Sequence, residues 1–94
     1  MKNCKLIGKI TKVEGQCDAG HHVGEKFDLT LYSEKPSKSH RTPHVCGFLY
    51  DAMFPYLVAL QFGAVFPWEK DKDKWLAGCP DNQNVQVEIR RIRT

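Results

Sequence analysis

The spacing of apolar and polar residues predicts two β-strands, each with one apolar face. Residues 25–31 alternate cleanly, which is the period-two pattern of a strand buried on one side only. Residues 85–92 alternate in the same way before a group of arginines. The two apolar faces consist of Phe27, Leu29 and Leu31 in the first strand, and of Val85, Val87 and Ile89 in the second.

A third strand is predicted at residues 5–13, although its alternation is interrupted. Ile7 and Val13 fall on one face, and Ile10 is out of phase with them. A glycine within a strand often marks a bulge, where one extra residue resets the alternation. We therefore expect a bulge at Gly8.

Residues 47–62 show a helical period instead of a strand period, and Gly63 is well placed to close the helix. Pro55 lies inside this segment, lacks an N–H donor and clashes with the carbonyl four residues earlier. The sequence therefore predicts either one kinked helix or two short ones, over about residues 48–53 and from Pro55 onward. The apolar stripe of this helical segment consists of Leu49, Met53, Leu57 and Leu60.

Two segments without a period are expected to be solvated. Residues 32–44 combine prolines, serines, charges and histidines, which predicts an exposed loop. Residues 69–74 alternate acidic residues with lysine, which predicts a solvated turn. The order strand, strand, helix, strand then predicts one α+β domain over residues 1–94. Its sheet is small, mainly antiparallel and of three or more strands, and the helix covers its apolar face.

Composition and charge narrow the classes of partner. The chain is 41% hydrophobic and 27% charged, as in ordinary soluble domains, so most of it is expected to be ordered. The net charge of +3 is mild, and the arginines of residues 90–93 alternate with isoleucine, which favours an edge strand with a solvated face over a phosphate patch. No nucleic-acid partner is expected. Without an apolar run of membrane-spanning length or a visible signal peptide, we expect no membrane partner and a cytoplasmic location.

Three of the four cysteines lie within two residues of a glycine or proline, where turns leave a thiol able to converge on a ligand. They are Cys17, Cys46 and Cys79, with gaps of 29 and 33 residues instead of close Cys-x-x-Cys pairs. Cytosolic thiols stay reduced, so metal binding is favoured over disulfides. Zinc and iron–sulfur clusters both take thiolate ligands. We therefore predict a three-thiolate metal site for zinc or an iron–sulfur cluster, completed by His22, by His44 or by water, with His22 preferred.

The motifs around these cysteines follow one another in a distinctive order. Gly-x-Cys precedes His-x-x-Gly-Glu-x-Phe, and Phe-Pro-Tyr and Phe-Pro-Trp-Glu frame the most specific segment. This order resembles a family of small prokaryotic proteins that has no assigned activity. The resemblance implies an intact fold and cysteines at positions 17, 46 and 79, whereas Cys4 has no counterpart and Gly47-Phe48 falls where the family varies. The matching segments are Gly15–Phe27, Cys46–Ala52, Phe54–Glu69, Cys79–Asp81 and Val85–Arg91.

A second class of function is a non-catalytic interaction module with structural cysteines. Aromatic residues are numerous for so thin a core, so some are expected to face outward and mark a surface for a protein partner or a homodimer. These residues are Phe54, Tyr56, Phe62, Phe66, Trp68 and Trp75.

A third class is a small thiol-dependent enzyme. Cys46 at the start of a helix would have its thiolate stabilised by the helix N-terminus. The base would be His21 or His22, brought in by the fold, and Asp51 and Asp81 are candidates for the group that orients the base.

Overall fold

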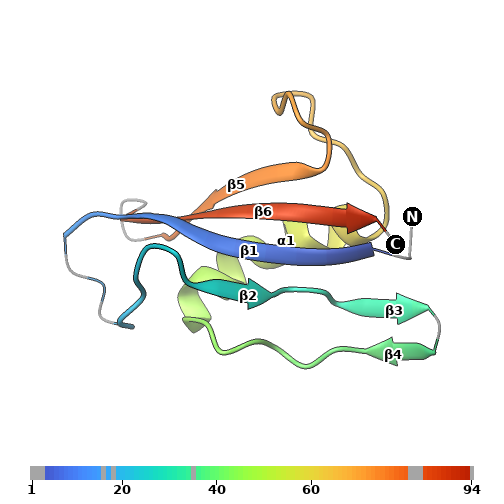
Figure 1. Ribbon diagram of the computed structural model, residues 1–94, viewed down its shortest axis with the longest axis horizontal. Helices are drawn as coiled ribbons and strands as arrows, with labels where there is room; N and C mark the ends of the chain where they lie inside the picture. The colour runs from blue at the N-terminus through green and yellow to red at the C-terminus, as the bar shows by residue number, and fades with distance from the viewer. Residues whose placement is uncertain (1–3, 16, 18, 35, 81–83, 94) are drawn as a thin grey trace.

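The computed structural model describes residues 4–15, 17, 19–34, 36–80 and 84–93, and it confirms the predicted α+β fold (Figure 1). These residues form a four-stranded sheet, a separate two-stranded hairpin and one α-helix. The helix lies across one face of the larger sheet. The elements are β1 (Cys4–Val13), β2 (Lys26–Asp28), β3 (Tyr32–Glu34), β4 (Ser37–Ser39), α1 (Gly47–Gln61), β5 (Lys74–Gly78) and β6 (Val85–Arg93).

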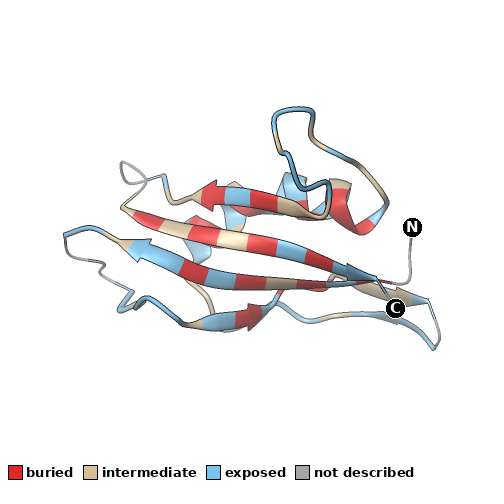
Figure 2. Ribbon diagram, turned by 45° about the horizontal axis from the view of Figure 1, so that its top comes forward, coloured by how far each residue is buried: buried red, intermediate tan, exposed pale blue. Residues whose placement is uncertain are grey.

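The larger sheet has the order β2-β1-β6-β5, with antiparallel pairing throughout. Strands β1 and β6 pair along nearly their whole length, from Cys4 opposite Arg93 to Val13 opposite Val85. Buried and exposed residues alternate along both strands, because one face of the sheet packs on α1 and the other faces solvent (Figure 2).

The prediction of a bulge at Gly8 is wrong, because the register of β1 with β6 shifts between Ile10 and Lys12 instead. Gly8 lies in phase with the buried Leu6 and Ile10. A Cβ atom on Gly8 would lie 2.6 Å from Cδ1 of Leu29. The glycine therefore provides room for a core side chain and does not reset the alternation.

The prediction that the C-terminal arginines lie on an edge strand is wrong. Strand β5 pairs with β6, so β6 is a central strand. Strand β5 begins at Lys74, the last residue of the predicted solvated turn, and was not anticipated. Trp75 and Ala77 of β5 are buried while Leu76 is exposed, so the strand does carry a short alternation.

The loop predicted at residues 32–44 contains the β3–β4 hairpin, and the strand predicted at 25–31 is shorter than expected. Beyond β2, a side chain takes the place of a backbone carbonyl as acceptor. The Thr30 hydroxyl accepts the Leu6 N–H of β1 at 3.0 Å. The Thr30 N–H in turn donates to Oδ1 of Asp28 at 3.0 Å. These side-chain bonds replace strand hydrogen bonds, so β2 ends at Asp28 although Leu29 stays buried.

Helix α1 is one continuous helix that includes Pro55. Of the two predicted arrangements, the structure therefore has a single helix and not two short ones. Its predicted apolar stripe, Leu49, Met53, Leu57 and Leu60, is buried. No helix among the residues that the structure describes is long and apolar enough to cross a membrane.

Gly63 ends α1 as predicted, with a φ of 99° that favours glycine. The Gly63 N–H donates to the Leu60 carbonyl at 3.3 Å, and the Ala64 N–H donates to the Ala59 carbonyl at 2.9 Å. This pair of bonds is the Schellman motif, which satisfies carbonyls left open at a helix end.

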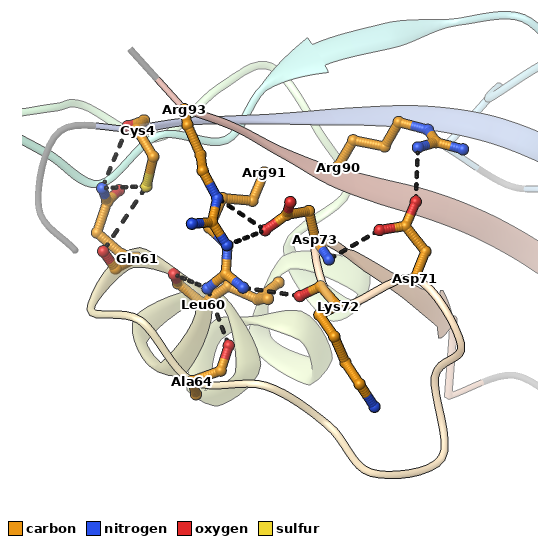
Figure 3. A network of polar contacts seen from close by, with 10 residues as sticks. All are labelled: Cys4, Leu60, Gln61, Ala64, Asp71, Lys72, Asp73, Arg90, Arg91 and Arg93. Carbon is orange, nitrogen blue, oxygen red and sulfur yellow. Dashed lines mark hydrogen bonds and ion pairs between the residues drawn. The ribbon is translucent and has the colours of Figure 1, made fainter.

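Arg91 holds the end of α1 against the loop that leads to β5 (Figure 3). Its side chain is fully buried, and its Nη1 donates to the carbonyls of Leu60 and Ala64 at 2.8 and 2.9 Å. Its Nη2 donates to the Lys72 carbonyl at 2.7 Å, and its Nε donates to Oδ1 of Asp73 at 3.0 Å. The guanidinium therefore joins three backbone segments at the C-terminal end of the helix.

Gln61 makes a second buried junction at the same end of the helix (Figure 3). Its Oε1 accepts the N–H groups of Leu31 and Tyr32 at 2.9 and 3.3 Å. Its Nε2 donates to the carbonyl and Sγ of Cys4 at 3.3 and 3.4 Å. Burial raises the pKa of the Cys4 thiol, against the opposing effect of Arg91. Cys4 is thus a buried structural thiol.

Candidate functional site

One end of the sheet gathers the other three cysteines. Cys17 lies in the connection from β1 to β2, Cys79 directly follows β5, and Cys46 is the N-cap residue of α1. Antiparallel pairing places the ends of β1 and β5 beside the starts of β2 and β6, so the two connections meet at the same end (Figure 1). Three segments far apart in sequence therefore approach one another there.

These three cysteines line one cavity of about 440 Å³. Each is half-buried and packs against the edge of the hydrophobic core. The volume lies within the range of small-molecule and cofactor sites. The remaining walls are largely apolar and consist of Ala19, His21, Phe48, Leu49, Pro80, Asn84 and Val85.

The lining thiols surround a space and do not meet at a point. Among the residues that the structure describes, no group of three or more His, Cys, Asp or Glu side chains is arranged to hold a metal ion. A tetrahedral zinc site, with bonds of about 2.3 Å to sulfur, needs its ligand atoms within about 4 Å of one another. The arrangement therefore differs from a closed site for a single ion.

Backbone hydrogen bonds fix the position of Cys79. Its N–H donates to the Val85 carbonyl at 2.9 Å, and the Val85 N–H donates to the Cys79 sulfur at 3.3 Å. A backbone N–H directed at a sulfur stabilises negative charge on that atom and is a common feature around thiolate ligands. The start of β6 therefore positions the Cys79 sulfur and directs a backbone N–H dipole at it.

His21 fixes the position of Cys46. The His21 side chain is only 6% exposed, its Nε2 accepts the Cys46 N–H at 3.1 Å, and its Nδ1 lies 2.9 Å from Oε1 of Glu25. Because Nε2 accepts, the proton of the neutral ring is on Nδ1 and is donated to Glu25. Although desolvation acts in the opposite direction, the bonds from the His21 ring and the His22 N–H hold the pKa of Glu25 below its ordinary value.

His22, the preferred fourth ligand, does not line the cavity, and its side chain is 76% exposed. His44, the other candidate, lines an adjacent cavity of about 310 Å³ that shares His21 and Cys46 with the first. His40 lies away from both cavities, with its Nε2 2.7 Å from the Ser33 hydroxyl. The histidine that the fold brings to the cysteines is thus His21.

The arrangement also bears on thiol catalysis. Glu25 orients His21 next to Cys46, as the third member of a catalytic triad would. However, the His21 Nε2 already accepts the backbone N–H of Cys46, so the lone pair that would take the thiol proton is in use. Of the predicted orienting groups, Asp51 is exposed on α1, and Asp81 lies outside the described residues.

The sequence pointed to the three cysteines, and it offered His21 only as a possible base for a thiol enzyme. It did not indicate that His21 and Glu25 position the backbone of Cys46. His21 and His22 are adjacent, and the turn between Gly20 and Gly24, both with positive φ, determines which ring faces inward. The four-residue spacing from His21 to Glu25 was the available signal, but outside a helix this spacing carries no geometric meaning.

Comparison with protein-family models, with curated proteins and with solved structures found no match to this chain. By fold and site, the chain is a small α+β domain with a half-buried three-thiol cavity at one end of its sheet. The cavity's geometry and chemistry are therefore the basis for a proposal about function.

Proposed function

We propose that this chain is a small cytosolic protein that binds a thiolate-ligated metal centre, with an iron–sulfur cluster as the preferred group. Cys17, Cys46 and Cys79 would be its protein ligands. The observation that carries the proposal is that these three thiols, from three separate segments, line the same cavity. The expected role is that of an accessory or redox protein.

The residues present fit such a centre in their donor chemistry. Three thiolates are a soft ligand set that matches zinc, copper(I) and iron–sulfur clusters. The Val85 N–H directed at the Cys79 sulfur is a hydrogen bond of the kind that tunes bound thiolates. Phe48, Leu49 and Val85 give the cavity apolar walls that limit the access of water.

The way in which the three thiols line a common cavity favours a cluster over a single ion. In a four-iron cluster each cysteine binds a different iron atom, so the sulfur ligands stand further apart than around one zinc ion. The three thiols line a cavity of about 440 Å³, and among the described residues they form no group that could hold one ion, which is the reason for preferring a cluster. Three protein thiolates would leave one iron of a four-iron cluster open to another ligand.

The other residues of the site act by positioning. The ring of His21, held by Glu25, fixes the Cys46 backbone through the Cys46 N–H and thereby sets where this sulfur lies. A bound iron–sulfur cluster would supply one-electron transfer, while the protein supplies ligand positions, hydrogen bonds to sulfur and partial exclusion of water.

The test is elemental analysis of protein that has been purified without oxygen. We expect iron and acid-labile sulfide in a fixed ratio to protein, and we expect Cys17→Ser, Cys46→Ser and Cys79→Ser each to lower the metal content strongly. Cys4→Ser is the matched control, because Cys4 is buried at the far end of α1 and does not line the cavity.

Stoichiometric zinc without acid-labile sulfide would mean that the site binds a single ion instead of a cluster. The three sulfurs would then have to move closer together on binding. Folded protein that carries no metal after anaerobic purification and anaerobic reconstitution would refute the proposal. Equal metal loss in Cys4→Ser would also refute it, since the loss would then follow from instability and not from a missing ligand.

A further inference from the structure

Helix α1 is apolar on the side that faces away from the sheet as well as on its buried side. Asp51 is its only charged residue. A surface helix normally carries charged and polar residues opposite its buried stripe, and a helix that is apolar all round is normally covered on both sides. The outward side here consists of Asp51 and five exposed apolar residues, which are Phe48, Phe54, Pro55, Val58 and, just after the helix, Phe62. We call the five apolar residues the outer face.

The outer face has the apolar area of one side of a dimer interface. Phe48, Phe54 and Phe62 are 79%, 43% and 51% exposed, which at about 200 Å² for a fully exposed phenylalanine leaves roughly 350 Å² open. Pro55 and Val58 bring the total to about 450 Å². A standard interface buries about 800 Å² per partner, of which roughly 60%, or about 480 Å², is apolar.

The geometry points to a second copy of this chain as the occupant, packed antiparallel about a two-fold axis at Pro55. A two-fold interface joins a surface to itself and therefore has to be self-complementary. A face with a single charge offers nothing for a charged partner to recognise, whereas it matches its own apolar character. Burial of this face would also enlarge the thin core of a 94-residue domain.

The positions along α1 suit such a pairing. Phe48 and Phe62 lie seven residues on either side of Pro55, so Phe48 would face Phe62 of the partner subunit. Asp51 would lie opposite Ala59 of the partner subunit. With a rise of about 1.5 Å per residue, the two Asp51 carboxylates would be about 12 Å apart along the axis and would not face each other.

The helix crossing and the cysteine cavity also fit this pairing. Ala52, Pro55 and Ala59 place small side chains around the crossing point, which lets the two helices approach closely. Phe48 lines both the outer face and the cysteine cavity, so the dimer would cover one edge of that cavity. Dimer formation itself does not require a bound metal.

Sedimentation equilibrium of the whole chain over the micromolar range tests this inference. We expect a dimer. Phe48→Lys and Phe62→Lys should each raise its dissociation constant by about a hundredfold or more, because each removes a large aromatic contact and sets a charge against an apolar phenylalanine of the partner subunit. Leu76→Lys is the matched control, since Leu76 is as exposed as Phe62 but lies on β5, and it should leave the dimer intact.

A charge pair tests the antiparallel arrangement. The double variant Phe48→Lys/Phe62→Glu should dimerise at least about tenfold more tightly than Phe48→Lys/Phe62→Lys, because each lysine then faces a glutamate. Equal dissociation constants for the two double variants would overturn the pairing. A wild-type monomer at all concentrations would overturn the dimer, as would a monomer that binds neutral phosphatidylcholine vesicles through this face.

Discussion

Substitution of Arg91 by methionine should strongly destabilise the fold, although arginine is usually a surface residue. The guanidinium is fully buried and binds the carbonyls of Leu60, Ala64 and Lys72 as well as the Asp73 carboxylate. Methionine keeps much of the apolar stem and removes the charge with all of these bonds. The variant therefore isolates the guanidinium.

The expected loss is about 3–4 kcal/mol in the free energy of unfolding. Each carbonyl left without its charged donor costs about 1–3 kcal/mol, and the carbonyls of Leu60, Ala64 and Lys72 all lose theirs. Loss of the ion pair adds little, because Asp73 is 35% exposed and keeps its bond to Arg93. The apolar methionine side chain offsets part of this. A 94-residue domain has a total stability of about 5–14 kcal/mol, so the loss is a large part of the whole.

Arg93→Met is the matched control, because Arg93 binds the same Asp73 carboxylate but is 56% exposed. Exposed ion pairs contribute less than about 1 kcal/mol. Urea unfolding followed by circular dichroism and tryptophan fluorescence gives both values. If the two variants lose the same small amount, the buried network does not hold the end of α1 as described here.

The same network predicts acid sensitivity. The hydrogen bond from Arg93, followed by that from Arg91, holds the pKa of Asp73 below its ordinary value against the effect of desolvation. A carboxylate with a depressed folded pKa stabilises the fold above its unfolded pKa, and this contribution is lost as the pH falls through the folded pKa. Unfolding free energy should therefore decrease below about pH 4, and less steeply in Arg93→Met.

Two further pairs of variants test the core and the site. Gly8→Ala should cost about 1–3 kcal/mol by urea unfolding, since its Cβ would overlap the buried Leu29, whereas Gly47→Ala meets nothing within 4 Å and should be nearly neutral. His21→Ala should lower the metal content of anaerobically purified protein because Cys46 loses its support, while His22→Ala should leave it unchanged. Equal metal loss in both histidine variants would show that the exposed ring is a ligand after all.

The parts of the fold that could be predicted from sequence are those that a local pattern determines. The buried stripe of α1 and its end at Gly63 follow from a helical period and a glycine that can adopt positive φ. Strand β5 was missed because its alternation is short and follows a run of charges. The burial of Arg91 depends on carbonyls at a helix end and in a distant loop, and no local pattern encodes them.

The candidate site likewise has one part that the local sequence indicates and another that depends on distant contacts. The cysteines stand out by type and by their turn-forming neighbours, so Cys17, Cys46 and Cys79 could be named in advance. The choice of His21 over its neighbour depends on which way the loop turns, and the bond from the Cys46 N–H to the His21 ring joins residues 25 positions apart in the sequence. Such choices are set by tertiary structure and not by residue type.

X-ray absorption at the metal edge of anaerobically purified protein is the most direct test of whether three distant sulfurs bind one centre. The account predicts a first shell of sulfur together with a short iron–iron distance, and the loss of both features when any one of the three lining cysteines becomes serine. A first shell of oxygen and nitrogen alone, or a spectrum unaffected by those substitutions, would contradict it.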